Sequence, residues 1–280
     1  MSACTIWPFL FTLFTISSLQ CQVYSDNWQS LPDGDIESRI SPYNHTVIVK
    51  RKSNVYLYFV RKGKRYLESS MSRKNPYSLP IPYTQLFTVG YLYPEKIRSL
   101  LMLGVGGGTF TTYTHHYMPK VHIDAVDIDG EVLAMAKKYF YLQEDSRYRL
   151  HTQDAAKYLK NTQRKYDLVY ADTYRGGFIP QHLLQESYFR SIHNRLYAKG
   201  CLVINIGYTN NYKQALPIIR KLYSYVDLYK YPHRENRVLV ACKGKVRLSR
   251  EKLLQRAKGM QRLFHFTTRL NKILPYRKQF

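Results

Sequence analysis

The chain has 280 residues, of which 45% are hydrophobic, so it can bury a sizeable core and wholesale disorder is excluded. Its 43 Lys and Arg against 19 Asp and Glu give a formal charge of +24. Such a surface favours anionic partners, among them nucleic acid, acidic lipid and phosphorylated metabolites, and it repels polycations.

The N-terminal segment, residues 1–24, contains an apolar run over residues 6–19. This run is shorter than the roughly 20 residues that span a bilayer, and its length suits the core of a signal peptide. No Lys or Arg precedes it, which argues against a signal peptide. Two localisations stay open: cytoplasmic if the segment is not a signal, and exported or membrane-associated if it is.

The four cysteines are Cys4, Cys21, Cys201 and Cys242. No two of them have the spacing of metal ligands, so we expect no metal site. Cys201 and Cys242 fall in predicted strands, where a buried free thiol is the usual state. In an exported protein, a bridge between these two is the alternative.

Residues 25–80 predict a small β domain. Runs of β-branched and aromatic residues indicate short antiparallel strands over residues 46–50, 54–61 and 65–67. Residues 71–82 contain three prolines and predict a loop. A helix over residues 83–91 then leads into a second domain, residues 81–242.

From Ser99 onward, apolar strands alternate with helical segments. This alternation is typical of a doubly wound, mostly parallel sheet with helices on both faces. After the strand that starts at Ser99, we predict strands over residues 121–126, 148–152, 166–171, 201–206, 226–231 and 237–242, and helices over residues 110–117, 131–140, 155–160, 183–196 and 211–223.

The C-terminal tail, residues 243–280, carries twelve Lys and Arg and one acid. Its first part predicts a basic amphipathic helix, and such a helix binds an anionic membrane surface or RNA, or packs on the domain with a solvated outer face. The apolar face is predicted to hold Leu253, Ala257, Met260 and Phe264, and Lys252, Arg256 and Arg262 fall away from it.

A glycine-rich turn follows the strand that starts at Ser99. Gly104, Gly106 and Gly108 have the G-x-G-x-G spacing of a nucleotide-binding turn, in which backbone of positive φ lets a ligand approach closely. The next predicted strand ends at Asp127, close to the roughly 20-residue offset at which an acid binds a ribose hydroxyl. Together these features predict a nucleoside-binding βαβ unit, with a plain structural turn as the alternative.

Two more carboxylates, Asp154 and Asp172, follow later strands. The carboxyl ends of parallel strands meet at one edge of a sheet, where ligands bind. We therefore expect Asp127 at the ribose, Asp154 at the exocyclic amine of an adenine, and Asp172 at the reacting centre. A single acid after a strand is more commonly a helix cap or turn residue, so the recurrence carries this prediction.

Residues 99–206 resemble the catalytic domain of the spermidine synthase family, and a weaker resemblance extends over roughly residues 37–242. The matching stretches are Leu-Gly-Val-Gly-Gly-Gly at 103–108, Val-Asp-Ile-Asp-Gly-Glu-Val at 126–132, Asp154, Tyr-Asp-Leu-Val-Tyr-Ala-Asp-Thr-Tyr at 166–174, and Ile179-Pro180. The resemblance implies the class I S-adenosylmethionine-methyltransferase fold. We therefore expect a doubly wound, mostly parallel seven-stranded sheet. In this chain a small antiparallel β domain is expected to precede it.

The resemblance also implies a reaction, the transfer of an aminopropyl group from decarboxylated S-adenosylmethionine to an amine. Asp172 would be the base that takes the proton of the attacking amine. Tyr83 and Gln85 stand where a Tyr-Gln pair follows the small β domain of the family, with Thr84 between them. The implied cosubstrate-binding residues are Gly104, Gly106, Gly108, Asp127, Asp154 and Gln85, and the implied substrate-binding positions are Tyr83, Tyr174 and Arg175.

Two positions depart from the family pattern. Gly107 stands where the glycine turn usually carries an acid that helps hold the donor, and Arg175 stands where a second acid usually binds the amine. Arg175 favours an anionic acceptor or a donor that keeps its carboxylate, so methyl transfer from S-adenosylmethionine stays open as an alternative. A nucleoside-binding protein without catalytic activity is the third alternative, and a homodimer is the assembly we consider.

Overall fold

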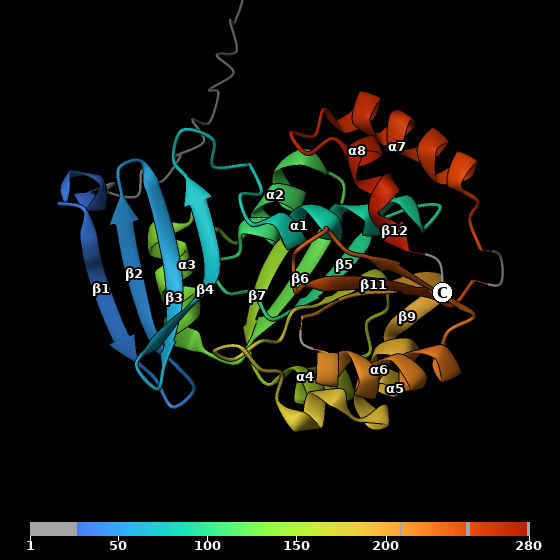
Figure 1. Cartoon of the computed structure of the whole chain (residues 1–280), viewed down its shortest axis with the longest axis horizontal. Coiled ribbons are helices and arrows are strands. Elements are labelled where there is room, and N and C mark those ends of the chain that lie inside the picture. Colours follow the sequence, from blue (N-terminus) through green and yellow to red (C-terminus); the bar gives the residue numbers. More distant parts are fainter. Residues whose placement is uncertain (1–26, 208, 245–246, 279–280) are drawn as a thin grey trace, which may run out of the picture.

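The computed structural model describes residues 27–207, 209–244 and 247–278. The predicted N-terminal segment, residues 1–24, lies outside this part of the chain. Two sheets dominate the fold: a four-stranded antiparallel sheet near the N-terminus and an eight-stranded, mostly parallel sheet (Figure 1). Within the described residues, no helix is both long and apolar enough to cross a membrane.

The small sheet has the order β1-β2-β3-β4, with every neighbouring pair antiparallel. Its first strand was not predicted, because β1 is a mostly exposed edge strand whose polar sequence lacks an apolar run. The strands are β1 (Gly34–Ile40), β2 (His45–Arg51), β3 (Asn54–Arg61) and β4 (Lys64–Ser72), and a short helix η1 (Asn27–Ser30) precedes them.

The large sheet has the order β12-β10-β11-β9-β8-β5-β6-β7. Five neighbouring strands, from β9 to β7, are parallel, and β11, β10 and β12 continue the sheet in antiparallel fashion. The prediction of a mostly parallel sheet is thus confirmed, and the tail adds the two-residue strand β12. The strands are β5 (Ser99–Leu103), β6 (His122–Asp127), β7 (Tyr148–Thr152), β8 (Tyr166–Ala171), β9 (Leu196–Ile206), β10 (Tyr225–Tyr229), β11 (Arg237–Cys242) and β12 (Arg277–Lys278).

Helices cover both faces of the large sheet, as Figure 1 shows. Along β8, Leu168 and Tyr170 point into the core layer under α2 and α7, and Val169 and Ala171 point into the layer under α4 to α6. The helices are α1 (Pro82–Phe87), η2 (Thr88–Leu92), α2 (Thr109–Tyr117), α3 (Gly130–Tyr139), α4 (Ala155–Asn161), η3 (Gln181–Leu184), α5 (Glu186–Arg195), α6 (Thr209–Leu222), α7 (Arg250–Phe264), α8 (Leu270–Ile273) and η4 (Leu274–Tyr276).

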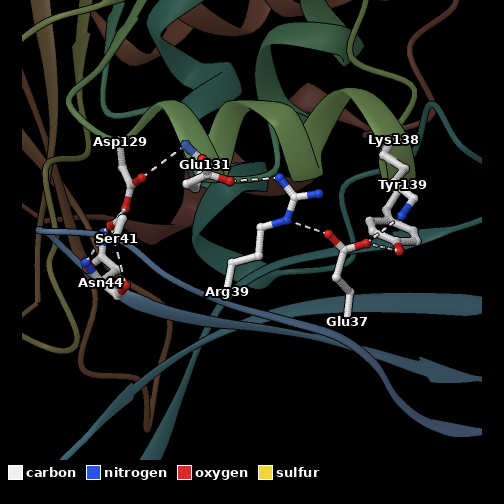
Figure 2. A network of polar contacts seen from close by, with 8 residues as sticks. All are labelled: Glu37, Arg39, Ser41, Asn44, Asp129, Glu131, Lys138 and Tyr139. Atoms are coloured by element: carbon white, nitrogen blue, oxygen red, sulfur yellow. Dashed lines mark hydrogen bonds and ion pairs between the residues drawn. The ribbon is translucent and has the colours of Figure 1, made fainter.

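The small sheet is fastened to α3 by a polar network, drawn in Figure 2. Arg39 donates a hydrogen bond to Glu37 on its own strand and another, of 2.7 Å, to Glu131 on α3. Asp129, the N-cap of α3, accepts from Ser41 (2.6 Å) and Asn44 (3.0 Å) in the loop between β1 and β2. The network therefore holds β1 and the loop after it against α3, the helix that follows β6.

The tail packs on the domain by its apolar face. Leu253 and Ala257 are buried, and Met260 and Phe264 are partly buried against the same core. The guanidinium of Arg256, which was predicted to fall away from this face, donates hydrogen bonds to the backbone carbonyls at the end of η2. An anionic membrane surface or RNA as a partner of the exposed basic face stays a prediction.

Cys201 and Cys242 form a disulfide bond between directly paired positions of β9 and β11. Both are buried as expected, but the free thiols expected by default are not observed, because the antiparallel register places the two side chains side by side.

Candidate active site

A cavity of about 290 Å³ opens at the carboxyl edge of the parallel strands. Residues that are distant in sequence line it, and they come from β4, from α1, and from the turns that follow β5, β6, β7 and β8. Among the predicted site residues, the cavity is lined by Tyr83, Gly104, Gly106, Asp127, Asp154, Asp172, Tyr174 and Arg175.

The glycine turn connects β5 to α2. Gly104, Gly106 and Gly108 all have positive φ, of 83°, 56° and 71°, which residues with a side chain rarely adopt. At Gly104 the space is also closed, since a Cβ would lie 2.2 Å from the backbone oxygen of Asp172. Gly108 does not line the cavity and instead forms the N-terminal cap of α2.

Asp127 lies at the end of β6, directly beside the glycine turn. One of its oxygens accepts hydrogen bonds from the N–H groups of Val105 (2.8 Å) and Gly106 (3.1 Å), and the other accepts from the N–H of Asp129 (3.0 Å). Burial raises the pKa of this carboxyl group above its ordinary value. Because a carboxylate offers about four acceptor sites, Asp127 keeps roughly one for a ligand hydroxyl.

Asp154 is both a helix cap and a residue of the cavity wall. One oxygen accepts from the N–H of Lys157 and so caps α4, and the other lies 3.0 Å from Nε2 of His182. The alternative considered for each acid therefore applies to Asp154, and a ligand amine would share its carboxylate with His182. Gln85 lies outside the cavity, because its side-chain amide turns away and donates to the carbonyl of Leu79 (2.9 Å).

Asp172 follows β8 and is held on both sides by neutral donors. Tyr83 on α1 donates its hydroxyl hydrogen to one carboxylate oxygen (2.8 Å), and the side-chain amide of Asn205 on β9 donates to the other (2.9 Å). Asn205 is itself held by the amide of Asn236 (3.1 Å). Burial raises the pKa of Asp172 to about 6, and the two hydrogen bonds oppose this shift. A carboxylate with such a pKa and a fixed orientation is suited to accept a proton near neutral pH.

The segment after Asp172 carries the two other predicted substrate positions. The hydroxyl of Tyr174 accepts a hydrogen bond from the N–H of Gly207. Arg175 lines the cavity, but its guanidinium donates to the carbonyls of Tyr43 (2.6 Å) and Pro42 (3.2 Å) in the loop between β1 and β2. It therefore joins the small sheet to the segment after β8.

Two functional candidates escaped the sequence analysis. Asn205 looks like any polar residue at the end of a strand, and only its position beside Asp172 reveals a role. Glu68 on β4 also lines the cavity, and burial together with the charges of Asp172 and Asp127 raises its pKa to about 8. The predicted strand over residues 65–67 stopped one residue before it.

Comparison with known proteins identifies the family to which this site belongs. The family model of the spermine/spermidine synthase domain matches residues 83–231, which include the glycine turn, the three aspartates and Asn205. The chain belongs to the spermine/spermidine synthase family. This confirms the resemblance predicted from the sequence and makes the protein a member of a family of transferases.

Individual relatives agree with this assignment. The polyamine aminopropyltransferase of Vibrio vulnificus is 28% identical over 212 residues, which cover 74% of this chain and 71% of that protein. The crystal structure of a probable spermidine synthase from Corynebacterium glutamicum superimposes with a TM-score of 0.69 at 16% identity, covering 82% of this chain and 88% of that one. Human methyltransferase-like protein 13, solved in complex with SAH, superimposes with a TM-score of 0.61 at 19% identity and covers 66% and 93% of the two chains.

Three carboxylates of the cavity in this spermidine synthase family member lack an ion pair in the part of the chain that the structure describes, although the protein is strongly basic. Within the described residues, no ion pair reaches Glu68, Asp127 or Asp172, and no group of three or more side chains forms a metal-binding cluster. The cavity thus presents carboxylates whose protonation is favoured by burial and mutual repulsion.

Proposed function

We propose that this protein transfers an aminopropyl group from decarboxylated S-adenosylmethionine to an amine acceptor. The acceptor nitrogen attacks the carbon next to the sulfonium, the carbon–sulfur bond breaks, and methylthioadenosine leaves with the electron pair on its sulfur. The nitrogen then loses a proton to Asp172. The single observation that carries the proposal is Asp172 itself, an oriented carboxylate in the cavity with a pKa of about 6.

The remaining residues of the cavity fit the cosubstrate. The glycine turn brings backbone close to the nucleoside, and Asp127 offers its remaining acceptor site to one ribose hydroxyl. Asp154 lies near enough to the cavity to accept from an adenine amine in place of His182. Tyr83 and Asn205 position the base.

A second candidate is methyl transfer from S-adenosylmethionine. It is favoured by the likeness to human methyltransferase-like protein 13 and by Arg175, a cation at the cavity that suits a carboxylate. The same nucleoside site would serve, and the reaction would need mainly alignment of nucleophile, carbon and sulfur. The carboxylates of the cavity oppose this candidate, because they would repel the carboxylate of that donor.

The deciding experiment is a calorimetric titration of the protein without residues 1–24, combined with a product assay. The three ligands are S-adenosylmethionine, its decarboxylated form and methylthioadenosine. We expect tightest binding of the decarboxylated donor and formation of aminopropylated product from putrescine. Preference for S-adenosylmethionine would instead support methyl transfer, and binding without product from either donor would indicate a nucleoside-binding protein that lacks activity.

We also propose a binding partner for the C-terminal helix and an oligomeric state. The exposed basic face of α7 is proposed to bind anionic vesicles or RNA, and such binding has to weaken as salt is added. A homodimer is proposed as the assembly. Vesicle and RNA binding at low salt and light scattering test these two separately from the chemistry.

A further inference from the structure

Strand β4 is irregular at Glu68. Leu57 and Tyr58 are neighbours on β3, yet they pair with Ser69 and Leu67, so Glu68 is an extra residue without a partner on β3. Such a bulge bends a strand and re-aims its side chains. As a consequence three consecutive residues, Glu68, Ser69 and Ser70, line the cavity, whereas a regular strand would point every second side chain away.

The same bulge closes the space above the glycine turn. The N–H of Gly107 donates to the hydroxyl of Ser69 (2.8 Å). A Cβ at Gly107 would lie 2.7 Å from the Cβ of Ser69 and 2.9 Å from the ring of Phe140, so no side chain fits there unless β4 moves. A carboxylate at position 107 is therefore excluded in this packing, and β4 provides a carboxylate to the cavity in Glu68.

The surroundings of Glu68 contain negative charge and little to balance it. Asp172 and Asp127 face it, and Tyr83 lies nearby, while a hydrogen bond from the backbone N–H of Gly176 opposes the shift of its pKa. Arg175 lines the same cavity, but its guanidinium is occupied by the carbonyls of Tyr43 and Pro42. An ammonium group placed among these acids would relieve their repulsion and satisfy a buried carboxylate.

We propose that Glu68 binds a primary alkylammonium group and thereby selects substrates that carry one. The inference rests on the proposed function, in which two such groups enter the cavity: the ammonium of the aminopropyl donor and the distal ammonium of a diamine acceptor. Glu68 is thus a specificity-determining residue, and it disfavours a donor that keeps its carboxylate.

The test for the donor compares two neutral-sulfur nucleosides by calorimetry at pH 7.5. Methylthioadenosine lacks an ammonium group, and its analogue with a 3-aminopropyl group in place of the methyl carries one. We expect the wild-type protein to prefer the amine ligand by roughly tenfold to a hundredfold, the range for a hydrogen bond to a charged group. In Glu68→Gln this preference falls below about threefold while methylthioadenosine binds as before. Glu95→Gln, which removes the same charge from an exposed residue paired with Lys199, keeps the wild-type preference.

A second arm distinguishes the acceptor as the source of the ammonium group. If the ligand preference survives in Glu68→Gln but the KM for putrescine rises at least roughly tenfold with little change in kcat, Glu68 binds the acceptor. The inference is overturned if neither arm changes, or if both nucleosides weaken equally, since that pattern describes a structural residue. Failure of the proposed function looks different, because the wild-type protein would then yield no aminopropylated product.

Discussion

Two sets of carboxylates in this protein differ in the charge of their neighbours: the first set is paired with Arg or His side chains, and the second set lies in the cavity without an ion pair from the described part of the chain. Asp124, in the middle of β6, is contacted by His151 (3.0 Å) and Arg164 (2.9 Å), and its pKa lies below the ordinary value although burial opposes this. Asp172, at the end of β8, receives its hydrogen bonds from a neutral amide and a neutral hydroxyl, and its pKa is raised to about 6. Asp124 is thus paired with cations, whereas Asp172 has only neutral hydrogen-bond partners.

Asp227 on β10 is paired with cations in the same way as Asp124. It is fully buried, and Arg247 (2.6 Å) and Arg277 (2.7 Å) from the tail both reach it, with Tyr93 donating a further hydrogen bond. A chain with a charge of +24 has cations in abundance, yet its ion pairs leave Glu68, Asp127 and Asp172 without one among the described residues. The difference is consistent with the proposal that Glu68 binds the ammonium group of a substrate.

The largest expected effect comes from the base. Asp172→Asn keeps the shape of the side chain but cannot accept the proton, so we expect the rate of aminopropyl transfer to fall roughly 10²–10⁴-fold. Methylthioadenosine should still bind, which shows that the cavity is intact. Asp167→Asn serves as the control, since Asp167 lies near the opposite end of the same strand and accepts hydrogen bonds from the N–H groups of Arg98 and Ser99. Unchanged turnover in Asp172→Asn would remove Asp172 from the chemistry.

Removing a carboxylate of the first set should lower the stability of the fold and not the catalytic rate directly. Asp227→Ala leaves two arginines beside a buried space, so we expect the free energy of unfolding to fall by about 3–5 kcal/mol. Urea denaturation followed by circular dichroism measures this change. Asp35→Asn, in an exposed pair with Arg65, is the matched control and should change stability by less than about 1 kcal/mol. A loss as small as that of the control would mean that the tail does not depend on Asp227.

The contribution of a carboxyl group to the stability of the protein should change with pH in opposite directions for the two sets. The folded protein keeps the Glu68 proton up to a pKa of about 8, whereas the unfolded chain releases it near 4.3, so this group lowers the stability as pH rises through that window. The lowered pKa of Asp124 works in the other direction, since its stabilisation is present above about 3.9 and is lost as the pH falls through its folded-state pKa.

Glu68→Gln therefore should raise the melting temperature at pH 8 by roughly 5–7 °C more than it does at pH 5. Differential scanning fluorimetry of the protein without added ligand measures both values. An equal shift at the two pH values would show that Glu68 titrates normally and would weaken the contrast between the two sets.

The sequence predicted the part of the cavity at the strand ends of the large sheet better than the part that the small sheet contributes. The bounds of β8 and β11 coincide with the predicted strands, because buried central strands have continuous apolar runs. The bounds of the edge strand β7 also coincide, although its sequence is mostly polar. The carboxylates at those strand ends then follow from the topology. Glu68 could not be found in this way, since a bulge interrupts the alternation that reveals which side chains share a face.

The direction of individual side chains could not be predicted from the sequence either. Gln85 and Arg256 lie on predicted helices, but Gln85 donates to a carbonyl in the loop before its own helix. Arg256 donates to carbonyls that only the tertiary fold brings close. Arg175 is the same case at the cavity: its type suggested an anionic ligand, and its contacts are backbone carbonyls of a loop far away in sequence.

Arg175 gives the smallest expected effect and the last test of the comparison. If its guanidinium serves mainly to hold the loop between β1 and β2, Arg175→Ala loses two hydrogen bonds that are partly exposed to water, about 1 kcal/mol in all. We expect the KM for an amine acceptor to change by less than about threefold and that for a carboxylated donor not to rise, as steady-state kinetics with each substrate would measure. A large rise confined to an anionic substrate would instead place the guanidinium on that substrate. The cavity would then hold a cation after all, and the contrast with Asp124 and Asp227 would no longer stand.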